Sequence, residues 1–320
     1  MGLWEINADT LARCRFVVSP LAETTSCLFA LNKPAAGHPA ERAWLNAHLP
    51  AFRALLADDP ITALLLRSVR SRTWNADFVT PTPTGEGTPT FEEEVVPVRE
   101  AAPDLVQADL EATLGGPPPA ALRRTDLGER MAGLLEWVWR ETVLPSWPTR
   151  RRVLEADIVA RTRQLGQGGW AAALDDIHPG MRWLGENRLQ VNAHDYPPRE
   201  LSGALLLLVP VTPAKRWISW DDEGRHAVVY QCSGTLALGP AVPGGLGRLI
   251  GPARAGVLVR LDAPKSTSQL VALTGQGLGS VGRHLKVLLD AGLVTRRRAG
   301  RAVLYYRTAA GDALVRATDT

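Results

Sequence analysis

The chain has 320 residues, 45% of them hydrophobic and 22% charged, which is typical of globular proteins and enough for two domains. Its longest apolar run, Leu201–Val211, is far too short to span a membrane, and the first residues lack the pattern of a secretory signal. Three widely spaced cysteines fit a reducing cytoplasm better than disulfides or a zinc cluster. We therefore expect a cytoplasmic protein without membrane contact and without a cofactor.

The net charge of +3 is unevenly divided along the chain. Residues 246–320 contain 12 arginines and lysines but 4 acidic residues, a local charge of +8, whereas the preceding 245 residues carry −5. A basic module attached to an acidic body is typical of proteins that bind nucleic acid through one part only. We predict a domain over residues 1–240 for sensing or dimerisation, and a DNA-binding domain over residues 246–320.

The front of the chain is predicted to be mainly helical. Gly2–Asn7 is expected to form a short strand, and Asp9 to cap the helix after it. Ser19 at the N-cap and Pro20 at N1 are typical of the start of another helix. Further helices are predicted at residues 38–59, 61–69, 91–114, 130–147, 151–165 and 170–177. The helix over 91–114 is expected to break near Pro97 and Pro103, and Pro145 and Pro148 are expected to divide the helix over 130–147 from the helix over 151–165.

Short apolar or alternating runs indicate strands farther along. They lie at residues 188–192, 200–211, 216–220 and 227–232, and we expect them to pair in one small sheet. Asp221–His226 is predicted to be a hairpin turn. A connector is expected at residues 238–247, followed by one helix over residues 248–262 with its true start at Pro252.

No catalytic signature is present, so we expect no enzyme activity. The glycine-rich run that begins at Gly275 follows a predicted helix rather than a strand and lacks a lysine for phosphate. It is therefore not interpreted as a nucleotide-binding loop.

Ten tryptophans allow two interpretations, because aromatic rings can pack a core or can line a pocket for an organic effector. Trp217 and Trp220, which flank a predicted strand, are among the candidates, but the residues of such a site cannot be named. Several potential metal ligands fall in the strand-rich part. They are His178, His194, Asp195, His226 and Cys232. Their spacing matches no known pattern of metal ligands, so we expect these side chains to be packed in the core or exposed to solvent rather than to bind a metal.

Near the C-terminus, the sequence predicts two helices joined by a glycine turn. A hydroxyl at Ser266 or Thr267 can cap the first helix, whose apolar side is formed by Leu270, Val271 and Leu273. Gly275 and Gly277 are expected to break this helix by adopting positive φ. The second helix is predicted over Gly279–Ala291 and ends at Gly292. Its buried stripe consists of Val281, Leu285, Leu288 and Leu289.

Two strands follow, Val294–Arg297 and Ala302–Tyr306, around a tight turn, and together they form a basic hairpin. Helix, turn, helix and hairpin together predict a winged helix-turn-helix, whose second helix fits the major groove of duplex DNA. Arg283 is the first choice for a guanine contact, His284 or Ser280 for a base or phosphate contact, and Lys286 with the wing arginines for phosphate binding. The predicted DNA-binding residues are Ser268, Gln269, Gln276, Gly279, Ser280, Arg283, His284, Lys286, Arg297, Arg298 and Arg301.

The segment from Leu246 to Thr308 resembles the DNA-binding domain of ArsR-type repressors, most closely at Ser280–Val294 and in the wing at Arg296–Arg307. The resemblance implies that the second helix is the recognition helix and that the protein is a homodimeric repressor. The family often has serine where this chain has Gly277 and Gly282, which weakens helix capping and one phosphate contact here. Residues 8–24 resemble the sensory part of larger ArsR-type regulators of actinobacteria.

Metal-sensing members of that family carry a Cys-x-Cys box on the first helix of the motif, or histidines on the last helix. This chain has neither cysteine nor histidine at Thr267–Gly275 or at Asp312–Thr320, so metal sensing is not expected.

The predicted fold class is mainly α with small β parts (α+β), in which a winged helix-turn-helix follows a large helical domain with a small sheet. The predicted function is that of a repressor that binds an inverted-repeat operator as a homodimer. A small organic effector is expected to control this binding. The alternatives are a small-molecule-binding or enzymatic front domain fused to a DNA-binding tail, and a front domain that serves dimerisation alone.

Overall fold

The structure is a computed structural model that describes residues 2–34, 39–71, 74–174, 177, 180–192, 197–232, 243–262, 264–274, 276–299 and 302–317. The chain forms two compact units, Met1–Pro148 with Arg161–Ser233 and Thr149–Ala160 with Gly234–Thr320, which we call the N-terminal and C-terminal units. No helix in these ranges is both long enough and apolar enough to cross a bilayer.

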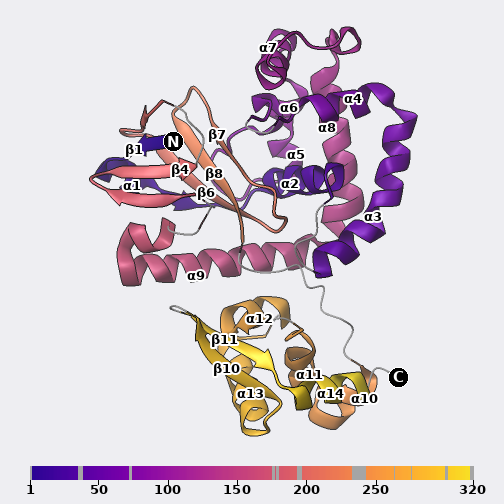
Figure 1. Cartoon of the computed structure of the whole chain (residues 1–320), viewed down its shortest axis with the longest axis vertical. Coiled ribbons are helices and arrows are strands. Elements are labelled where there is room, and N and C mark those ends of the chain that lie inside the picture. The colour runs from indigo at the N-terminus through magenta and orange to yellow at the C-terminus, as the bar shows by residue number, and fades with distance from the viewer. Residues whose placement is uncertain are drawn as a thin grey trace. The chain divides into compact units, whose positions relative to one another are not determined.

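Helices dominate the first part of the chain, with strands at its start and after α9 (Figure 1). This composition confirms the predicted α+β class. The elements are β1 (Gly2–Glu5), α1 (Ala8–Arg13), β2 (Arg15–Phe16), α2 (Pro20–Asn32), α3 (Pro39–Asp58), α4 (Pro60–Ser68), α5 (Phe91–Glu94), α6 (Val96–Arg99), α7 (Pro103–Leu114), α8 (Leu127–Val138), α9 (Trp147–Leu174), β3 (Arg182–Gly185), β4 (Arg188–Asn192), β5 (Arg199–Glu200), β6 (Leu205–Val211), β7 (Trp217–Trp220) and β8 (Arg225–Gln231). Short helical turns lie at Asp77–Val79, Ala120–Leu122, Trp139–Val143 and Leu144–Ser146.

The main sheet has the strand order β2-β6-β8-β7, with β6 parallel to β8 and β7 antiparallel to β8. Every residue of β6 is buried, as expected of a strand covered on both faces. Successive side chains point to opposite faces. Leu207 and Val209 therefore join the core formed with the helices, whereas Leu206 and Leu208 join a second core with the other sheet.

The second sheet corrects the prediction that the strands form one sheet. Its order is β3-β4-β1-β5, so β4 pairs with the N-terminal strand rather than with β6. The register places Leu3 opposite Gln190 and Trp4 opposite Leu189. Alternating hydrophobicity identifies a strand but carries no information about a partner that lies so far away in the sequence.

Asn7, not Asp9, caps helix α1. The Asn7 side chain accepts a hydrogen bond from the backbone N–H of Thr10 at 2.9 Å, and Asp9 lies in the first turn. Both residue types suit the N-cap, so the sequence alone could not decide between them. The strand before the helix ends at Glu5, which leaves Asn7 available for the cap.

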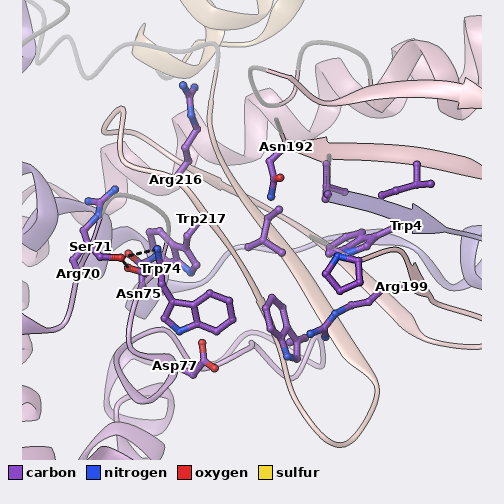
Figure 2. A pocket seen from close by; sticks show the side chains of 16 residues that line it. Trp4, Arg70, Ser71, Trp74, Asn75, Asp77, Asn192, Arg199, Arg216 and Trp217 are labelled. Atoms are coloured by element: carbon purple, nitrogen blue, oxygen red, sulfur yellow. Dashed lines mark hydrogen bonds between the residues drawn. The ribbon is translucent and has the colours of Figure 1, made fainter. Parts of the chain in front are cut away.

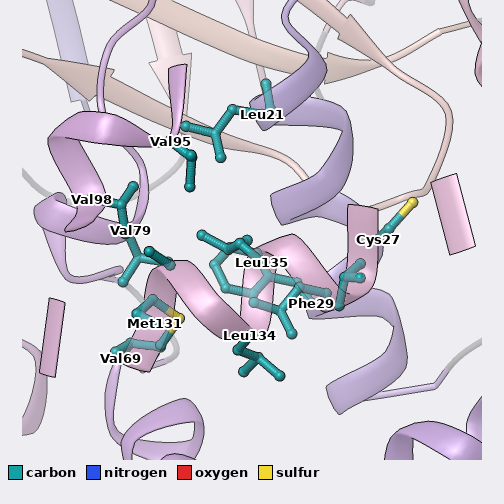
Figure 3. Close-up of a cluster of buried hydrophobic side chains, with 14 of the residues drawn as sticks. Leu21, Cys27, Phe29, Val69, Val79, Val95, Val98, Met131, Leu134 and Leu135 are labelled. Carbon is teal, nitrogen blue, oxygen red and sulfur yellow. The ribbon is translucent and has the colours of Figure 1, made fainter. Parts of the chain in front are cut away.

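The helical core lies around α2 and α8 (Figure 3). Met131, Leu134 and Leu135 of α8 are buried there, and Phe91 stacks on Trp139 with a centroid distance of 4.9 Å. Pro145 and Pro148 are predicted to divide two helices, but the break between these helices is less complete than expected. A tight helical turn leads directly into α9.

Helix α2 begins as predicted, with Pro20 at N1 and the Ser19 hydroxyl accepting from the N–H of Ala22 at 2.9 Å. Glu94 adds a second cap from another helix. Its Oε2 accepts from the N–H of Leu21 at 2.9 Å and from the Ser19 hydroxyl at 2.8 Å. Burial outweighs these hydrogen bonds and raises the pKa of Glu94 from its ordinary 4.5 to about 7.

Replacing Glu94 with glutamine is expected to remove a pH dependence of stability. The folded chain retains the Glu94 proton between about pH 4.5 and 7 while the unfolded chain releases it, so stability falls as the pH rises through this window. The Glu94→Gln variant should therefore be the more stable protein at pH 8, by up to about 3 kcal/mol. Urea unfolding of both proteins at pH 5 and pH 8 measures this difference, and an equal pH dependence in the two would contradict it.

The C-terminal unit contains, after residues 149–160 of α9, a compact arrangement of helices and one small sheet. The elements are α10 (Gly244–Ile250), α11 (Pro252–Val259), β9 (Lys265–Ser266), α12 (Thr267–Thr274), α13 (Leu278–Asp290), β10 (Val294–Ala299), β11 (Ala302–Arg307) and α14 (Ala309–Ala317). The sheet has the order β10-β11-β9. The hydrophobic core of the C-terminal unit includes Leu258, Leu270, Leu285 and Val315.

The helix predicted over residues 248–262 is divided into α10 and α11. Gly251 adopts φ +84° between them, and Pro252 starts α11 as predicted. Part of the expected connector, Gly244–Gly247, is helical instead. The rest of that connector, residues 238–242, lies outside the described residues.

Candidate nucleic-acid interface

Helix α12 starts with a capping box. The Ser266 hydroxyl accepts from the N–H of Gln269 at 3.3 Å, and the Gln269 side-chain oxygen accepts from the N–H of Ser266 at 2.8 Å. The predicted start of this helix is therefore confirmed. The amide oxygen of Gln269 is therefore occupied by the hydrogen bond of the capping box. Ser268, the residue before it, is half-buried.

Helix α13 starts one residue before its predicted first position, at Leu278. Gly277 is its N-cap with φ −65° and ψ 151°, an extended conformation, so the expected positive φ is wrong at this position. An N-cap residue adopts extended angles that any amino acid can reach. Glycine supplies no side-chain cap here, and Gly275 lies outside the described residues.

The buried stripe of α13 forms as predicted. Val281, Leu285 and Leu288 are at most 1% exposed, and Leu289 packs against the same core. Gly292, at φ +67°, follows the end of the helix. This stripe fixes the rotation of α13 and therefore decides which side chains face outward.

The opposite face of α13 presents Gly279, Arg283 and Lys286 to solvent. A glycine at the first of these positions leaves the start of the helix open to close approach by a ligand. Arg283 and Lys286 are three residues apart and so lie on one side of the helix. The predicted base-reading and phosphate-binding side chains are thus brought together.

A row of polar side chains follows α13 at four-residue spacing, beside the exposed basic face. The Ser280 hydroxyl donates to Oε1 of Gln276 at 3.3 Å and lies 3.2 Å from Nε2 of His284. Gln276 also donates to the carbonyl of Ala253 in α11 at 3.4 Å. These three half-buried side chains hold one another in place, whereas Arg283 projects from the exposed side of the same helix.

The wing is a hairpin in which Arg297 lies opposite Leu304 and Arg298 opposite Val303. Arg296, Arg297 and Arg298 are all exposed, and alternation along the strand places Arg297 on the other face from its two neighbours. The Arg297 guanidinium lies 5.9 Å from the ring centroid of Tyr306. Arg301, also predicted to bind DNA, lies outside the described residues.

An ion pair between a buried lysine and an exposed aspartate anchors the base of the wing. Lys265 of β9 lies opposite Tyr305 of β11, and its ammonium is 2.5 Å from Oδ1 of Asp262. Burial lowers the pKa of Lys265, and the charge of Asp262 opposes that change. Arg307, with its Nε 2.9 Å from Asp312, ties the other end of β11 to α14. These charges are engaged within the unit rather than presented to a ligand.

Two apolar residues on the outer side of α13 were missed by the sequence interpretation. Leu278 is 62% exposed and Val287 is 44% exposed. Val287 follows Arg283 by four residues and shares its face. An aliphatic side chain in the major groove can contact the thymine methyl group. The four-residue spacing from Arg283 was the signal that could have found it.

The potential metal ligands do not form a site among the described residues, where no cluster of three or more histidine, cysteine or acidic side chains suits a metal. His226 instead packs edge-on against Trp4 with a centroid distance of 5.5 Å, and Cys232 is buried. His178, His194 and Asp195 lie outside the described residues. Asp221 forms the predicted hairpin turn by accepting from the N–H of Arg225 at 3.0 Å.

The comparison with protein families agrees with this geometry. Residues 258–296 match the family described as "Bacterial regulatory protein, arsR family", and this range contains α12, α13 and the first half of β10. No curated protein and no solved structure matches the chain. The C-terminal region is an ArsR-type helix-turn-helix, and the chain is a DNA-binding transcriptional regulator.

Proposed function

We propose that this protein is a repressor that binds an inverted-repeat operator as a homodimer. The observation that carries this proposal is the exposure of Arg283 and Lys286 on one side of α13 and of the arginines of the wing, Arg297 and Arg298 among them. Helix α13 enters the major groove, where Arg283 reads a guanine through its O6 and N7 atoms. The wing arginines bind phosphates alongside.

Two-fold symmetry determines the form of the operator. Two copies of α13 occupy successive major grooves, so the half-sites lie about one helical turn, roughly 34–36 Å, apart. The N-terminal unit has a regulatory rather than a catalytic role. Its effector is a small organic molecule rather than a metal, an assignment supported by the lack of cysteine and histidine in the two segments where the family's metal ligands lie, Thr267–Gly275 and Asp312–Thr320.

Replacing Arg283 with alanine is expected to cost about 1–3 kcal/mol on the operator and to relax the preference for one base pair. The reason is that a bidentate contact to guanine is lost while the phosphate contacts remain. Fluorescence anisotropy with the operator and with a duplex changed at that base pair measures both effects. Equal losses on operator and random DNA would refute the assignment of Arg283.

Arg298→Ala is the matched control, since it removes the same charge from the wing instead of the helix. It should weaken operator and random DNA alike and reduce the dependence of affinity on salt concentration. If Arg298→Ala instead lost affinity only for the operator, Arg298 would be the base-reading residue and Arg283 would be assigned to phosphate binding.

A further inference from the structure

A cavity of about 230 Å³ opens within the N-terminal unit (Figure 2). Its walls come from β1, β7, the end of β4, the start of β5, and the segment between α4 and the helical turn at Asp77–Val79. Four of the ten tryptophans line it. They are Trp4, Trp74, Trp217 and Trp220.

These rings are held by edge-on contacts with other rings. Trp74 meets Trp220 at a centroid distance of 5.6 Å, and Trp217 meets Phe29 at 5.8 Å. Trp4 and Trp217 are at most 7% exposed, so their orientation is fixed by packing. Flat apolar walls held in this way suit a planar ligand.

The charge around the cavity is mostly positive. Arg70, Arg199 and Arg216 line it together with one carboxylate, that of Asp77. The guanidinium of Arg199 lies 3.9 Å from the ring centroid of Trp220, and that of Arg70 lies 4.6 Å from the ring of Phe29. Within the described part of the chain, none of the three arginines forms a salt bridge.

Two lysines, Lys215 and Lys33, add positive charge near Arg70. Burial lowers the pKa of Arg70 and of Arg216. Burial also lowers the pKa of the neighbouring Lys215, an effect that the charges of Arg70 and Lys33 reinforce and that of Glu41 opposes. Arg70 and Arg216 are partly buried and form no salt bridge within the described residues, so an anion bound to them would offset the cost of their burial.

We propose that this cavity binds a small planar organic anion, with its acid group toward Arg70 and Arg216 and its ring between the tryptophans. The volume is below the roughly 300–1,000 Å³ of sites for drug-sized molecules, which restricts the ligand to one or two rings. The further step, that this ligand is the effector, rests on the proposed regulatory function.

Matched pairs of probes test the charge preference. The pairs are benzoate and benzamide, naphthalene-2-carboxylate and naphthalene-2-carboxamide, and indole-3-acetate and indole-3-acetamide, titrated into the full-length protein by calorimetry. At least one carboxylate should bind at least tenfold more tightly than its amide. Binding of no carboxylate at millimolar concentration, or equal binding of acid and amide in every pair, would overturn the proposal.

Variants locate the binding. Arg216→Gln should weaken the best carboxylate at least tenfold, and Asp77→Asn, which removes the opposing charge, should tighten it several-fold. Arg53→Gln, on the exposed side of α3, is the control and should leave binding unchanged. Equal affinity in the Arg216 and Arg53 variants would place the anion elsewhere and overturn the site.

Operator binding separates this inference from the function on which its last step rests. The best carboxylate should change operator affinity in the wild type but not in Arg216→Gln. Carboxylate binding without any change in operator affinity would refute the effector role. Failure of the protein to bind operator DNA both with and without the carboxylate would refute the repressor function and leave the calorimetric result standing.

Discussion

Replacing Leu285 with alanine is expected to lower the free energy of unfolding of the C-terminal unit by about 2–5 kcal/mol. Leu285 is 1% exposed and lies in the middle of the stripe that packs α13 against Leu258, Leu270 and Val315. Truncation removes buried apolar surface and leaves a cavity, because a packed core relaxes only partly. This cost is a large fraction of the stability of a small domain, so operator affinity should fall as well.

The tryptophans allow the two units to be followed separately. All ten lie at or before Trp220, so their fluorescence reports the N-terminal unit, whereas far-ultraviolet circular dichroism includes the helices of both. In Leu285→Ala the fluorescence midpoint in urea should be unchanged while part of the dichroism transition moves to lower urea. Val287→Ala, on the exposed side of the same helix, should leave both signals unchanged. Equal effects of the two substitutions would show that α13 is packed differently.

Replacing Glu23 with alanine is expected to destabilise the N-terminal unit by about 2–4 kcal/mol. Glu23 is fully buried in α2 and joins that helix to the end of β6. Its Oε2 accepts from the N–H of Thr212 at 2.8 Å, and its Oε1 accepts from the Thr212 hydroxyl. Removing the carboxylate takes away an acceptor from two buried donors at once, and water cannot readily replace it there.

Glu92→Ala is the control, because Glu92 is exposed on α5. Tryptophan fluorescence in urea should show a lower midpoint for Glu23→Ala and the wild-type midpoint for Glu92→Ala. Wild-type stability of Glu23→Ala would mean that this carboxylate does not hold α2 to the sheet. Because the effect belongs to the N-terminal unit, operator binding at low temperature should be retained.

Local signals explain what could be predicted from the sequence. Serine before proline predicts the start of α2, and spacing of three and four residues predicts the buried side of α13. Arginines beside a tight turn predict the wing. Each of these features depends on residues that are close together in the chain.

Long-range pairing explains what could not be predicted. The partnership of β1 with β4 joins residues near opposite ends of the N-terminal unit, and nothing in either strand specifies the other. Similarly, Glu23 appears in the sequence as a first-turn helix residue, and only the fold brings Thr212 to it. The cavity proposed to bind an anion also needs the fold, because Arg70, Arg199 and Arg216 come from three separate segments.

The central claim is that the exposed face of α13 reads duplex DNA. Its most direct test is the binding of the full-length protein to DNA from its own upstream promoter and to a shuffled duplex, at several salt concentrations. The account predicts tighter binding to the promoter duplex, with that preference reduced in Arg283→Ala and kept in Arg53→Gln. Equal affinity of the wild type for both duplexes, or an unchanged preference in Arg283→Ala, would contradict it.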